Sequence, residues 1–252
     1  PEPIPFFGEL GSINPMFILD HALANRGAEI AAGWAGSLTM GAGQFCTNPG
    51  VAIVTAGSEA DNFIRTTGEA LATIGEQTML TTGIARAYHA GHDRFAASAG
   101  VREVFTSTCD LRGASPYLFV TSGADWLANK DLGEEVFGPL GLVVIVTDDA
   151  QRLAVAKSLG GQLTCTIHMD DLDNDGARAL LPVIERKAGR VLANGFPTGV
   201  EVCDAMVHGG PYPASTNFGA SSVGTLSIRR FLRPVSFQNI PLEILPDDLK
   251  TN

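Results

Sequence analysis

One cysteine of this chain stands in a turn-forming segment, "GQFCTNPG", at residues 43–50. A nucleophilic thiol needs access to its substrate and a stabilised thiolate, which the backbone N–H groups of a loop or helix end can provide. Gly41 and Gly43 allow close approach of the backbone to a substrate, and Asn48-Pro49-Gly50 predicts a turn. Cys46 is therefore a candidate nucleophile. The alternative is that it fills the core as a small apolar residue.

Two other side chains are candidates to assist such a thiol. Glu9 follows two phenylalanines in "FFGELG", so we expect burial to raise the pKa of its carboxyl group, as a general base near neutrality requires. His208 lies in the glycine- and proline-rich segment "VHGGPYPAS", and a histidine far away in sequence often activates a cysteine. The alternatives are that the Glu9 carboxylate caps a helix and that His208 is hydrogen-bonded in a tight turn.

A third segment, "EEVFGP" at residues 134–139, offers two carboxylates, a phenylalanine and a Gly-Pro turn. Its carboxylates could accept hydrogen bonds from sugar hydroxyls, with Phe137 as an apolar wall. The alternative is an acidic loop ahead of a strand. Cys109, Cys165 and Cys203 lack a comparable glycine setting, and we expect them to be structural.

No metal site is expected from the sequence. "DLDNDG" begins like a calcium-binding loop at Asp171, but its twelfth position is Pro182 where a bidentate glutamate is needed. This segment is better interpreted as a turn that caps the next helix. His89 and His92 have a helical spacing without an evident third ligand. The sequence also contains neither of the two common glycine-rich phosphate-binding motifs.

Composition excludes several classes of protein. The formal net charge of −10 argues against nucleic-acid binding, which needs a basic face. The longest apolar runs, such as Leu142–Val146, are strand-sized, and a membrane helix needs about 18 or more apolar residues. The four cysteines lie far apart in the sequence, so we expect reduced thiols and a cytoplasmic location.

Short β-branched runs alternate with longer helical patterns along most of the chain, which predicts an α/β fold: a three-layer, open, mostly parallel sheet. The expected strands are residues 51–56, 101–106, 117–121, 142–147, 163–168 and 190–194. The expected helices are residues 20–42, 58–75, 83–98, 149–159 and 176–188, with Asp148 or Asp149 capping the fourth. The tail contains "VSFQN", which predicts an edge strand, an arm that pairs elsewhere, or a frayed end.

Three of these segments together resemble the aldehyde dehydrogenase superfamily. "GELGSINP" is similar to the family's glutamate motif, "GQFCTNPG" to its cysteine motif 37 positions later, and "EEVFGP" to its coenzyme-contact segment. The resemblance covers essentially the whole chain, as the second half of a full-length member. "VHGGPYPAS" and "RRFLRPVSFQNIP" resemble the branch of α-ketoglutaric semialdehyde (2,5-dioxovalerate) dehydrogenases and their fatty-aldehyde relatives.

The resemblance implies a mechanism. Cys46 would attack the aldehyde to give a thiohemiacetal and then a thioester, and Glu9 would activate the hydrolytic water. Glu135, Phe137 and Gly11 would contact NADP or NAD, and His208 is our addition as a modulator of Cys46. The substrate would be a small-molecule aldehyde, such as the acid semialdehyde 2,5-dioxopentanoate.

The resemblance also implies a domain organisation. Residues 1–15 would end a missing coenzyme-binding domain, 16–228 would form the catalytic domain, and 229–252 would be an oligomerisation arm in a homo-oligomer. The sequence begins with "PEPIPFFGEL" and not with a methionine, which predicts a fragment that is not a competent dehydrogenase by itself. Two other functions stay open: a cofactor-free cysteine hydrolase or acyltransferase that uses Cys46 and His208, and a non-catalytic assembly module.

Overall fold

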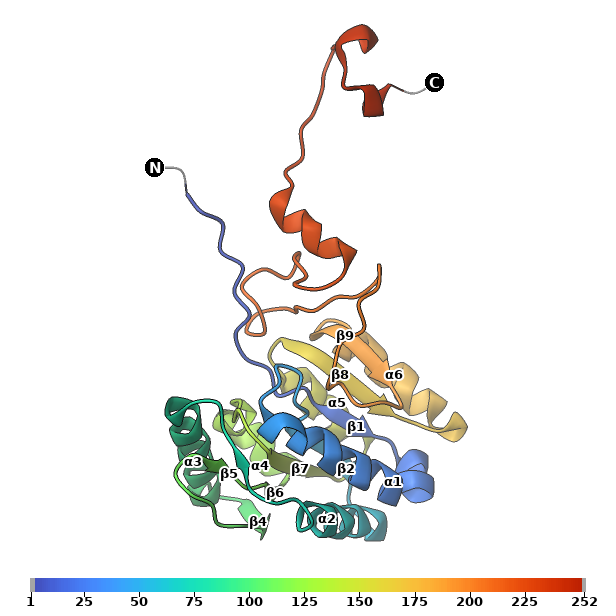
Figure 1. Cartoon of the computed structure of the whole chain (residues 1–252). Helices are drawn as coiled ribbons and strands as arrows, with labels where there is room; N and C mark the ends of the chain where they lie inside the picture. The colour runs from blue at the N-terminus through green and yellow to red at the C-terminus, as the bar shows by residue number, and fades with distance from the viewer. Residues whose placement is uncertain (1–2, 251–252) are drawn as a thin grey trace.

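A seven-stranded sheet forms the centre of the computed structural model, which describes residues 3–250 (Figure 1). The strand order is β4-β6-β7-β2-β1-β8-β9, and every neighbouring pair is parallel except β4 with β6. Its strands are β1 (Met16–Ile18), β2 (Val51–Thr55), β4 (Val101–Phe105), β6 (Tyr117–Ser122), β7 (Leu140–Val146), β8 (Gln162–His168) and β9 (Ala188–Ala193). A separate small ladder pairs β3 (Gln77–Thr78) with β5 (Gly113–Ala114).

Helices cover both faces of this sheet (Figure 1). They are α1 (Asp20–Thr39), α2 (Ser58–Leu71), α3 (Thr82–Ala97), α4 (Gly123–Ala128), α5 (Asp149–Ser158) and α6 (Asn174–Ile184). Trp34 of α1 and Phe63 of α2 belong to one apolar cluster, whereas Tyr88 of α3 and Leu180 of α6 belong to another. The predicted three-layer, mostly parallel α/β fold is therefore confirmed.

The central strand β1 was not among the expected strands. It has only three residues, too few to show an alternating or a helical period. Its side chains nevertheless alternate between the two apolar clusters: Met16 and Ile18 join one, and Phe17 joins the other. All three are fully buried, because β1 lies between β2 and β8.

The six expected strands are confirmed, and Asp148 caps α5 by accepting a hydrogen bond from the Gln151 backbone N–H. The expected helix at 20–42 ends earlier, at Thr39. The reason is that Gly41, Ala42 and Gly43 follow with left-handed φ angles of 57°, 58° and 65°. The short helix α4 was missed, since six residues carry little periodic signal.

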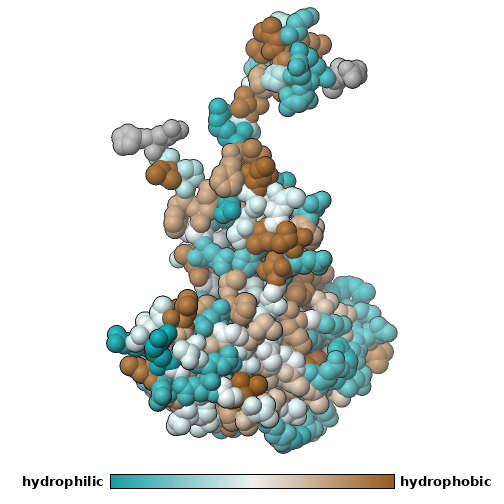
Figure 2. Space-filling view, viewed as in Figure 1, coloured by the Kyte–Doolittle hydropathy of each residue, from teal (hydrophilic) through white to brown (hydrophobic). Residues whose placement is uncertain are grey.

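Both end segments extend from the body of the domain (Figure 1). The segment "VSFQN" forms no strand within the described residues, so the prediction of an edge strand in the chain's own sheet is wrong. Apolar side chains stay exposed along the tail, among them Phe231 (79%), Leu232 (63%) and Ile244 (69%), and Figure 2 shows apolar surface there. Across residues 3–250, none of the helices has the length and apolar character needed to cross a membrane.

Gly43 is the point where the segment before Cys46 touches the segment that leads into β7. A Cβ atom at this position would lie 2.3 Å from the Gly138 carbonyl carbon and 2.5 Å from the Pro139 nitrogen. The missing side chain of Gly43 therefore allows close approach to the protein's own backbone, and approach to a substrate stays a prediction.

The substitution Gly43→Ala tests this contact. We expect it to lower the free energy of unfolding by roughly 2–4 kcal/mol, because alanine disfavours a left-handed φ and its methyl group would force two backbones apart. The matched control is Gly68→Ala in α2, where no atom lies within 4 Å of the added Cβ, and it should raise stability by about 0.5–1 kcal/mol. Denaturant unfolding measures the free energy of unfolding of both variants. An equal change in the two variants would contradict the contact at Gly43.

Candidate functional site

The candidate residues gather at the amino-terminal edge of the sheet. Glu9 precedes β1, Cys46 precedes β2 and Glu135 precedes β7 in the sequence. These three strands are neighbours in the order β7-β2-β1 and run parallel. The segments that lead into them therefore meet at one edge, whereas ligands of open α/β sheets usually bind at the carboxyl ends of the strands.

Cys46 lies in a tight turn. The backbone N–H of Asn48 donates to the Phe45 carbonyl oxygen at 3.0 Å, so Cys46 and Thr47 are the two central residues of a β-turn. Cys46 is partly exposed, while Thr47 and Asn48 are buried. The turn thus holds the thiol at the surface of a well-packed segment, as a nucleophile requires.

His208 and Glu9 contact each other beside the thiol. The Nε2 atom of His208 lies 3.3 Å from the Cys46 Sγ atom and 3.0 Å from the Glu9 Oε2 atom. Hydrogen bonds from the imidazole to Cys46 and to Glu9 raise the pKa of His208 to about 9. Its side chain is only 8% exposed. The imidazole is therefore positively charged at neutral pH and lies directly beside the Cys46 sulfur.

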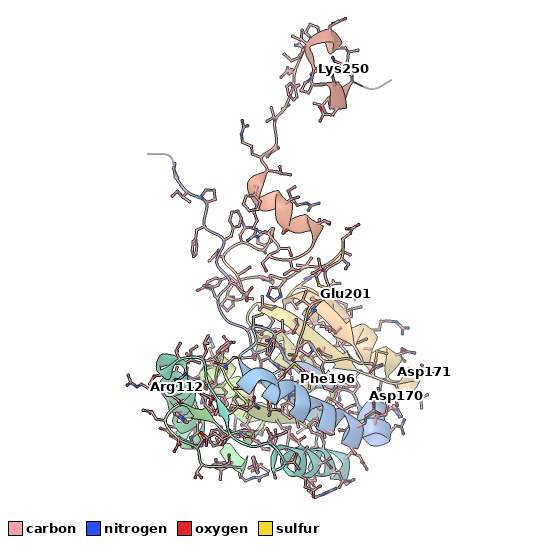
Figure 3. All side chains as sticks on the ribbon, viewed as in Figure 1. Arg112, Asp170, Asp171, Phe196, Glu201 and Lys250 are labelled. Carbon is pink, nitrogen blue, oxygen red and sulfur yellow. The ribbon has the colours of Figure 1, made fainter. Side chains whose placement is uncertain are left out.

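His208 comes from the opposite end of the chain and is held by several contacts. Its backbone N–H donates to Ser221 Oγ at 2.9 Å, and Glu9 forms a backbone bridge with Ser215. The chain between β9 and His208 passes α1, where a Cβ on Gly33 would meet the ring of Phe196 (Figure 3). The predicted proximity of Cys46, Glu9 and His208 is present in the structure.

The expectation for the pKa of Glu9 is wrong. Phe6 and Phe7 do not bury the carboxylate, since they are 74% and 36% exposed and the Glu9 side chain is itself 36% exposed. The hydrogen bond to His208 outweighs the remaining burial and lowers the pKa of Glu9. Glu9 is therefore an ionised carboxylate at neutral pH.

The buried side chain of Asn14 joins the Glu9 segment to the Cys46 turn. Its Nδ2 group donates to the carbonyl oxygens of Cys46 (2.9 Å), Asn48 (3.0 Å) and Ser12 (3.2 Å). Its Oδ1 atom accepts from Ser12 Oγ at 2.9 Å and from the backbone and hydroxyl of Thr164 in β8. This one amide fixes the turn, the Glu9 segment and β8 relative to each other.

Two more amide side chains complete this network. Asn48 Nδ2 donates to the Gly138 carbonyl oxygen at 2.9 Å, which ties the Cys46 turn to the 134–139 segment. Gln162 Oε1, at the start of β8, accepts from the backbone N–H groups of Ile13 and Asn14. Sequence reasoning missed Asn14 and Gln162. An Asn-Pro dipeptide directly before the apolar run "MFIL" was the available signal for Asn14.

Glu135 occupies a second, more buried part of the edge. A pocket there is lined by Ser12, Asn48, Glu135 and Phe137 among others. Burial raises the pKa of Glu135 to about 7, against the effect of a hydrogen bond from the Ser12 backbone. A Cβ on Gly11 would lie 3.0 Å from the Glu135 Oε2 atom, so only glycine leaves this space free. The structure thus brings Gly11, Glu135 and Phe137 to the same edge as Cys46.

The other candidates lie outside this site. Glu134 forms an ion pair with Arg94 at 2.9 Å, and none of the four cysteines is in a disulfide. Cys165 is buried, as expected of a structural cysteine, but Cys203 is exposed, so the prediction for Cys203 is wrong.

The two segments first considered as metal sites have other contacts. Both ring nitrogens of His92 contact carboxylates, those of Asp93 and Glu103. The segment at Asp171 forms a short 3₁₀ helix (Asp171–Asp173) that is capped by reciprocal bonds between Asp170 and Asp173. The helix α6 then begins without a side-chain cap, so the predicted cap of that helix is not present. Neither segment gathers three candidate ligands within residues 3–250.

Two curated relatives match almost the whole chain. It is 48% identical to α-ketoglutaric semialdehyde dehydrogenase 2 of Azospirillum brasilense, over 99% of this chain and 48% of that protein. It is 44% identical to α-ketoglutaric semialdehyde dehydrogenase of Acinetobacter baylyi, over the same shares. By their names both relatives are aldehyde dehydrogenases, and this chain spans about half the length of each.

Solved aldehyde dehydrogenase structures share the fold. An NAD-dependent aldehyde dehydrogenase from Sinorhizobium meliloti superposes with a TM-score of 0.67 at 17% identity, over 88% of this chain and 43% of that one. A glyceraldehyde-3-phosphate dehydrogenase from Methanocaldococcus jannaschii, complexed with NADP, superposes with a TM-score of 0.65 at 20% identity. The match covers 82% of this chain and 44% of that one. No protein-family model matches the sequence.

The substitution Asn14→Asp tests the network that holds the Cys46 turn. It keeps the shape of the side chain but replaces the donating Nδ2 group by an acceptor that faces three carbonyl oxygens. We expect it to lower the free energy of unfolding by about 3–5 kcal/mol, as for an unpaired buried charge. Asn62→Asp, on the exposed face of α2, is the control and should change it by less than about 0.5 kcal/mol. A loss below about 1 kcal/mol at Asn14, measured by denaturant unfolding, would contradict the network.

The substitution Glu135→Gln tests the buried carboxyl group. Because the pKa of Glu135 is raised to about 7 in the folded chain, the unfolded chain releases this proton first as the pH rises above about 4.5. The native side chain therefore lowers stability progressively from about pH 4.5 to pH 7, and glutamine removes this loss. We expect the variant to gain about 3 kcal/mol relative to the native chain as the pH rises from 4.5 to 8.

The neighbouring substitution Glu134→Gln is the control, because this side chain is 59% exposed. This variant loses only the surface ion pair with Arg94, so its stability should stay within about 1 kcal/mol of that of the native chain at every pH. Chemical unfolding at several pH values measures the difference, and a pH-independent gain for Glu135→Gln would show that the carboxyl group titrates normally.

Proposed function

We propose that this chain supplies the nucleophile and the base of an NAD(P)-dependent aldehyde dehydrogenase that oxidises an acid semialdehyde to the carboxylic acid. The observation that carries this proposal is the convergence of Cys46, His208 and Glu9, with Sγ–Nε2 and Nε2–Oε2 distances of 3.3 and 3.0 Å. The names of the two curated relatives support α-ketoglutaric semialdehyde as the substrate.

Cys46 acts as the nucleophile in this proposal. The imidazolium of His208, with its pKa raised to about 9, stabilises the thiolate that attacks the aldehyde carbon. A thiohemiacetal forms, and the backbone N–H of Cys46 contributes to an oxyanion hole. Loss of hydride converts this species to a thioester on Cys46. A nicotinamide cofactor, when bound, accepts that hydride.

Glu9 acts as the general base of the second half-reaction. Its pKa is lowered by His208, so it is ionised and able to take a proton from water. Its side chain is 36% exposed, which gives water a path to the thioester. Because Glu9 Oε2 now contacts His208 Nε2, the attacking water must replace this contact.

The pocket beside Glu135 fits one end of the cofactor. The Glu135 carboxyl group would accept hydrogen bonds from ribose hydroxyls, Phe137 would pack against the cofactor, and Gly11 leaves space beside the Glu135 carboxyl group. The sequence contains no common phosphate-binding motif, so the diphosphate would be bound by residues outside this chain. The choice between NAD and NADP lies with those residues too.

The geometry favours this function over a cofactor-free cysteine hydrolase. In a hydrolase relay, the acid binds the histidine nitrogen that does not face the nucleophile. Here Glu9 and Cys46 both contact Nε2 of His208. Glu9 is thus placed beside the sulfur, where the base for thioester hydrolysis is needed.

The exposed apolar tail supports an assembly role for the predicted domains. We infer that residues 16–228 form the catalytic domain and that the tail from residue 229 is an arm that binds a second copy. Exposed apolar side chains from Phe231 to Ile244 need such a surface. Sedimentation of the chain with and without the residues after Leu232 tests this, and an unchanged oligomeric state would contradict it.

Protection of the Cys46 thiol tests the proposed function. We expect iodoacetamide to modify Cys46 faster than the exposed Cys203 at neutral pH, because the His208 imidazole lies 3.3 Å from the Cys46 sulfur. α-Ketoglutaric semialdehyde, at ten times its dissociation constant, should slow modification of Cys46 roughly tenfold and leave Cys203 unaffected. Hexanal, which lacks the acid groups, should protect less. Mass spectrometry of each peptide gives the rates, and equal protection of both cysteines would contradict the proposal.

A further inference from the structure

Three metal-binding side chains converge on one point of this site. The Sγ atom of Cys46, Nε2 of His208 and a carboxylate oxygen of Glu9 all lie within 4.8 Å of one another. They come from three segments that are far apart in sequence. We propose that these three side chains form a Zn²⁺-binding site and that bound Zn²⁺ reversibly blocks the Cys46 nucleophile.

The spacing of the donor atoms suits a tetrahedral ion. Zinc bound to sulfur at about 2.3 Å and to nitrogen or oxygen at about 2.0–2.2 Å places its ligands roughly 3.3–3.6 Å apart. The observed Sγ–Nε2 distance is 3.3 Å and the Nε2–Oε2 distance is 3.0 Å. These two distances are thus already close to those of a zinc site. The third distance, from Sγ to the Glu9 carboxylate, is at most 4.8 Å, and the partly exposed Glu9 side chain has to move to close it.

The chemistry of the donors selects zinc over the harder cations. Thiolate and imidazole are ligands for Zn²⁺, whereas Mg²⁺ and Ca²⁺ need mostly oxygen. The Cys46 thiolate and the Glu9 carboxylate together neutralise the two positive charges of the ion. His208 binds the ion as a neutral imidazole, so zinc displaces the proton on Nε2, which is released to solvent. Three protein ligands leave a fourth position for water, and Glu9 is the more exposed side of the cluster.

The surrounding contacts hold the histidine ready for an ion. His208 is 8% exposed and anchored through its backbone to Ser221, so its ring is largely ordered before binding. The guanidinium of Arg190 donates to the carbonyl oxygens of Pro197 and Gly199 and not to the three donor atoms. The polar network around Asn14 fixes the Cys46 turn in the same way.

Occupation of the site would inhibit any reaction that starts at Cys46. The metal would take the sulfur lone pair and the Glu9 carboxylate at once, so neither attack on an aldehyde nor activation of water could proceed. Removal of the ion by a chelator restores both groups. The proposal needs only the three donor atoms and does not rest on the proposed dehydrogenase activity.

Direct metal titration of the reduced, chelator-treated chain tests the proposal. Competition with a chromophoric zinc indicator should show one Zn²⁺ bound per chain, and Co²⁺ should give a thiolate charge-transfer band. We expect His208→Gln and Cys46→Ser each to weaken Zn²⁺ binding by at least about tenfold, and Cys46→Ser to abolish the band. Cys203→Ser, which removes an exposed thiol outside the cluster, is the matched control and should change neither.

A second measurement uses the unsubstituted chain, so that a misfolded variant cannot decide the outcome. One equivalent of Zn²⁺ should slow the alkylation of Cys46 and leave that of Cys203 unchanged, and EDTA should restore the original rate. Zinc binding that survives both ligand substitutions, or that follows Cys203, would overturn the proposal. So would alkylation of Cys46 at the same rate with and without the ion. Protection by aldehyde can fail while zinc binding succeeds, so the two proposals are tested separately.

Discussion

The buried amide of Asn14 is the interaction on which the site depends. Its Nδ2 group donates to three backbone carbonyl oxygens, and its Oδ1 atom accepts from the Thr164 backbone in β8. One side chain thus connects the loops that lead into β1 and β2 with the strand β8. Unpaired buried carbonyl groups would each cost about 1–3 kcal/mol, which makes this arrangement hard to replace. The Cys46 turn and the Glu9 segment therefore keep a fixed relation although 36 residues separate them.

The parallel sheet explains why these segments meet at all. β7, β2, β1 and β8 are adjacent and share one direction, so the chain enters all four strands at the same edge. Asn48 extends the contact to Gly138, and Gly43 allows two backbones to touch. The cysteine, glutamate and coenzyme-contact segments are thus positioned by strand order and by hydrogen bonds that sequence spacing does not reveal.

The two carboxyl groups of this edge have opposite environments. Glu9 is partly exposed and paired with His208, so its pKa falls, whereas burial raises the pKa of Glu135 to about 7. The sequence suggested the reverse for Glu9, because two preceding phenylalanines were expected to bury it. Whether those rings pack on the carboxylate is decided by tertiary structure, and here Phe6 is largely exposed and Phe7 leaves Glu9 partly exposed. The strands, the cap at Asp148 and the pairing of Cys46 with Glu9 could be predicted from local pattern and motif order. β1, Asn14 and Gln162 could not, because their roles come from distant contacts.

The central claim is that Cys46, Glu9 and His208 lie in direct contact in this chain. A ¹⁵N NMR titration of the His208 imidazole in metal-free buffer tests it most directly. We expect a pKa of about 9 in the native chain, and a fall towards the ordinary value when Cys46 is replaced by alanine. A native value near the unperturbed one of about 6.5 would mean that the imidazole has neither partner, and would contradict the site.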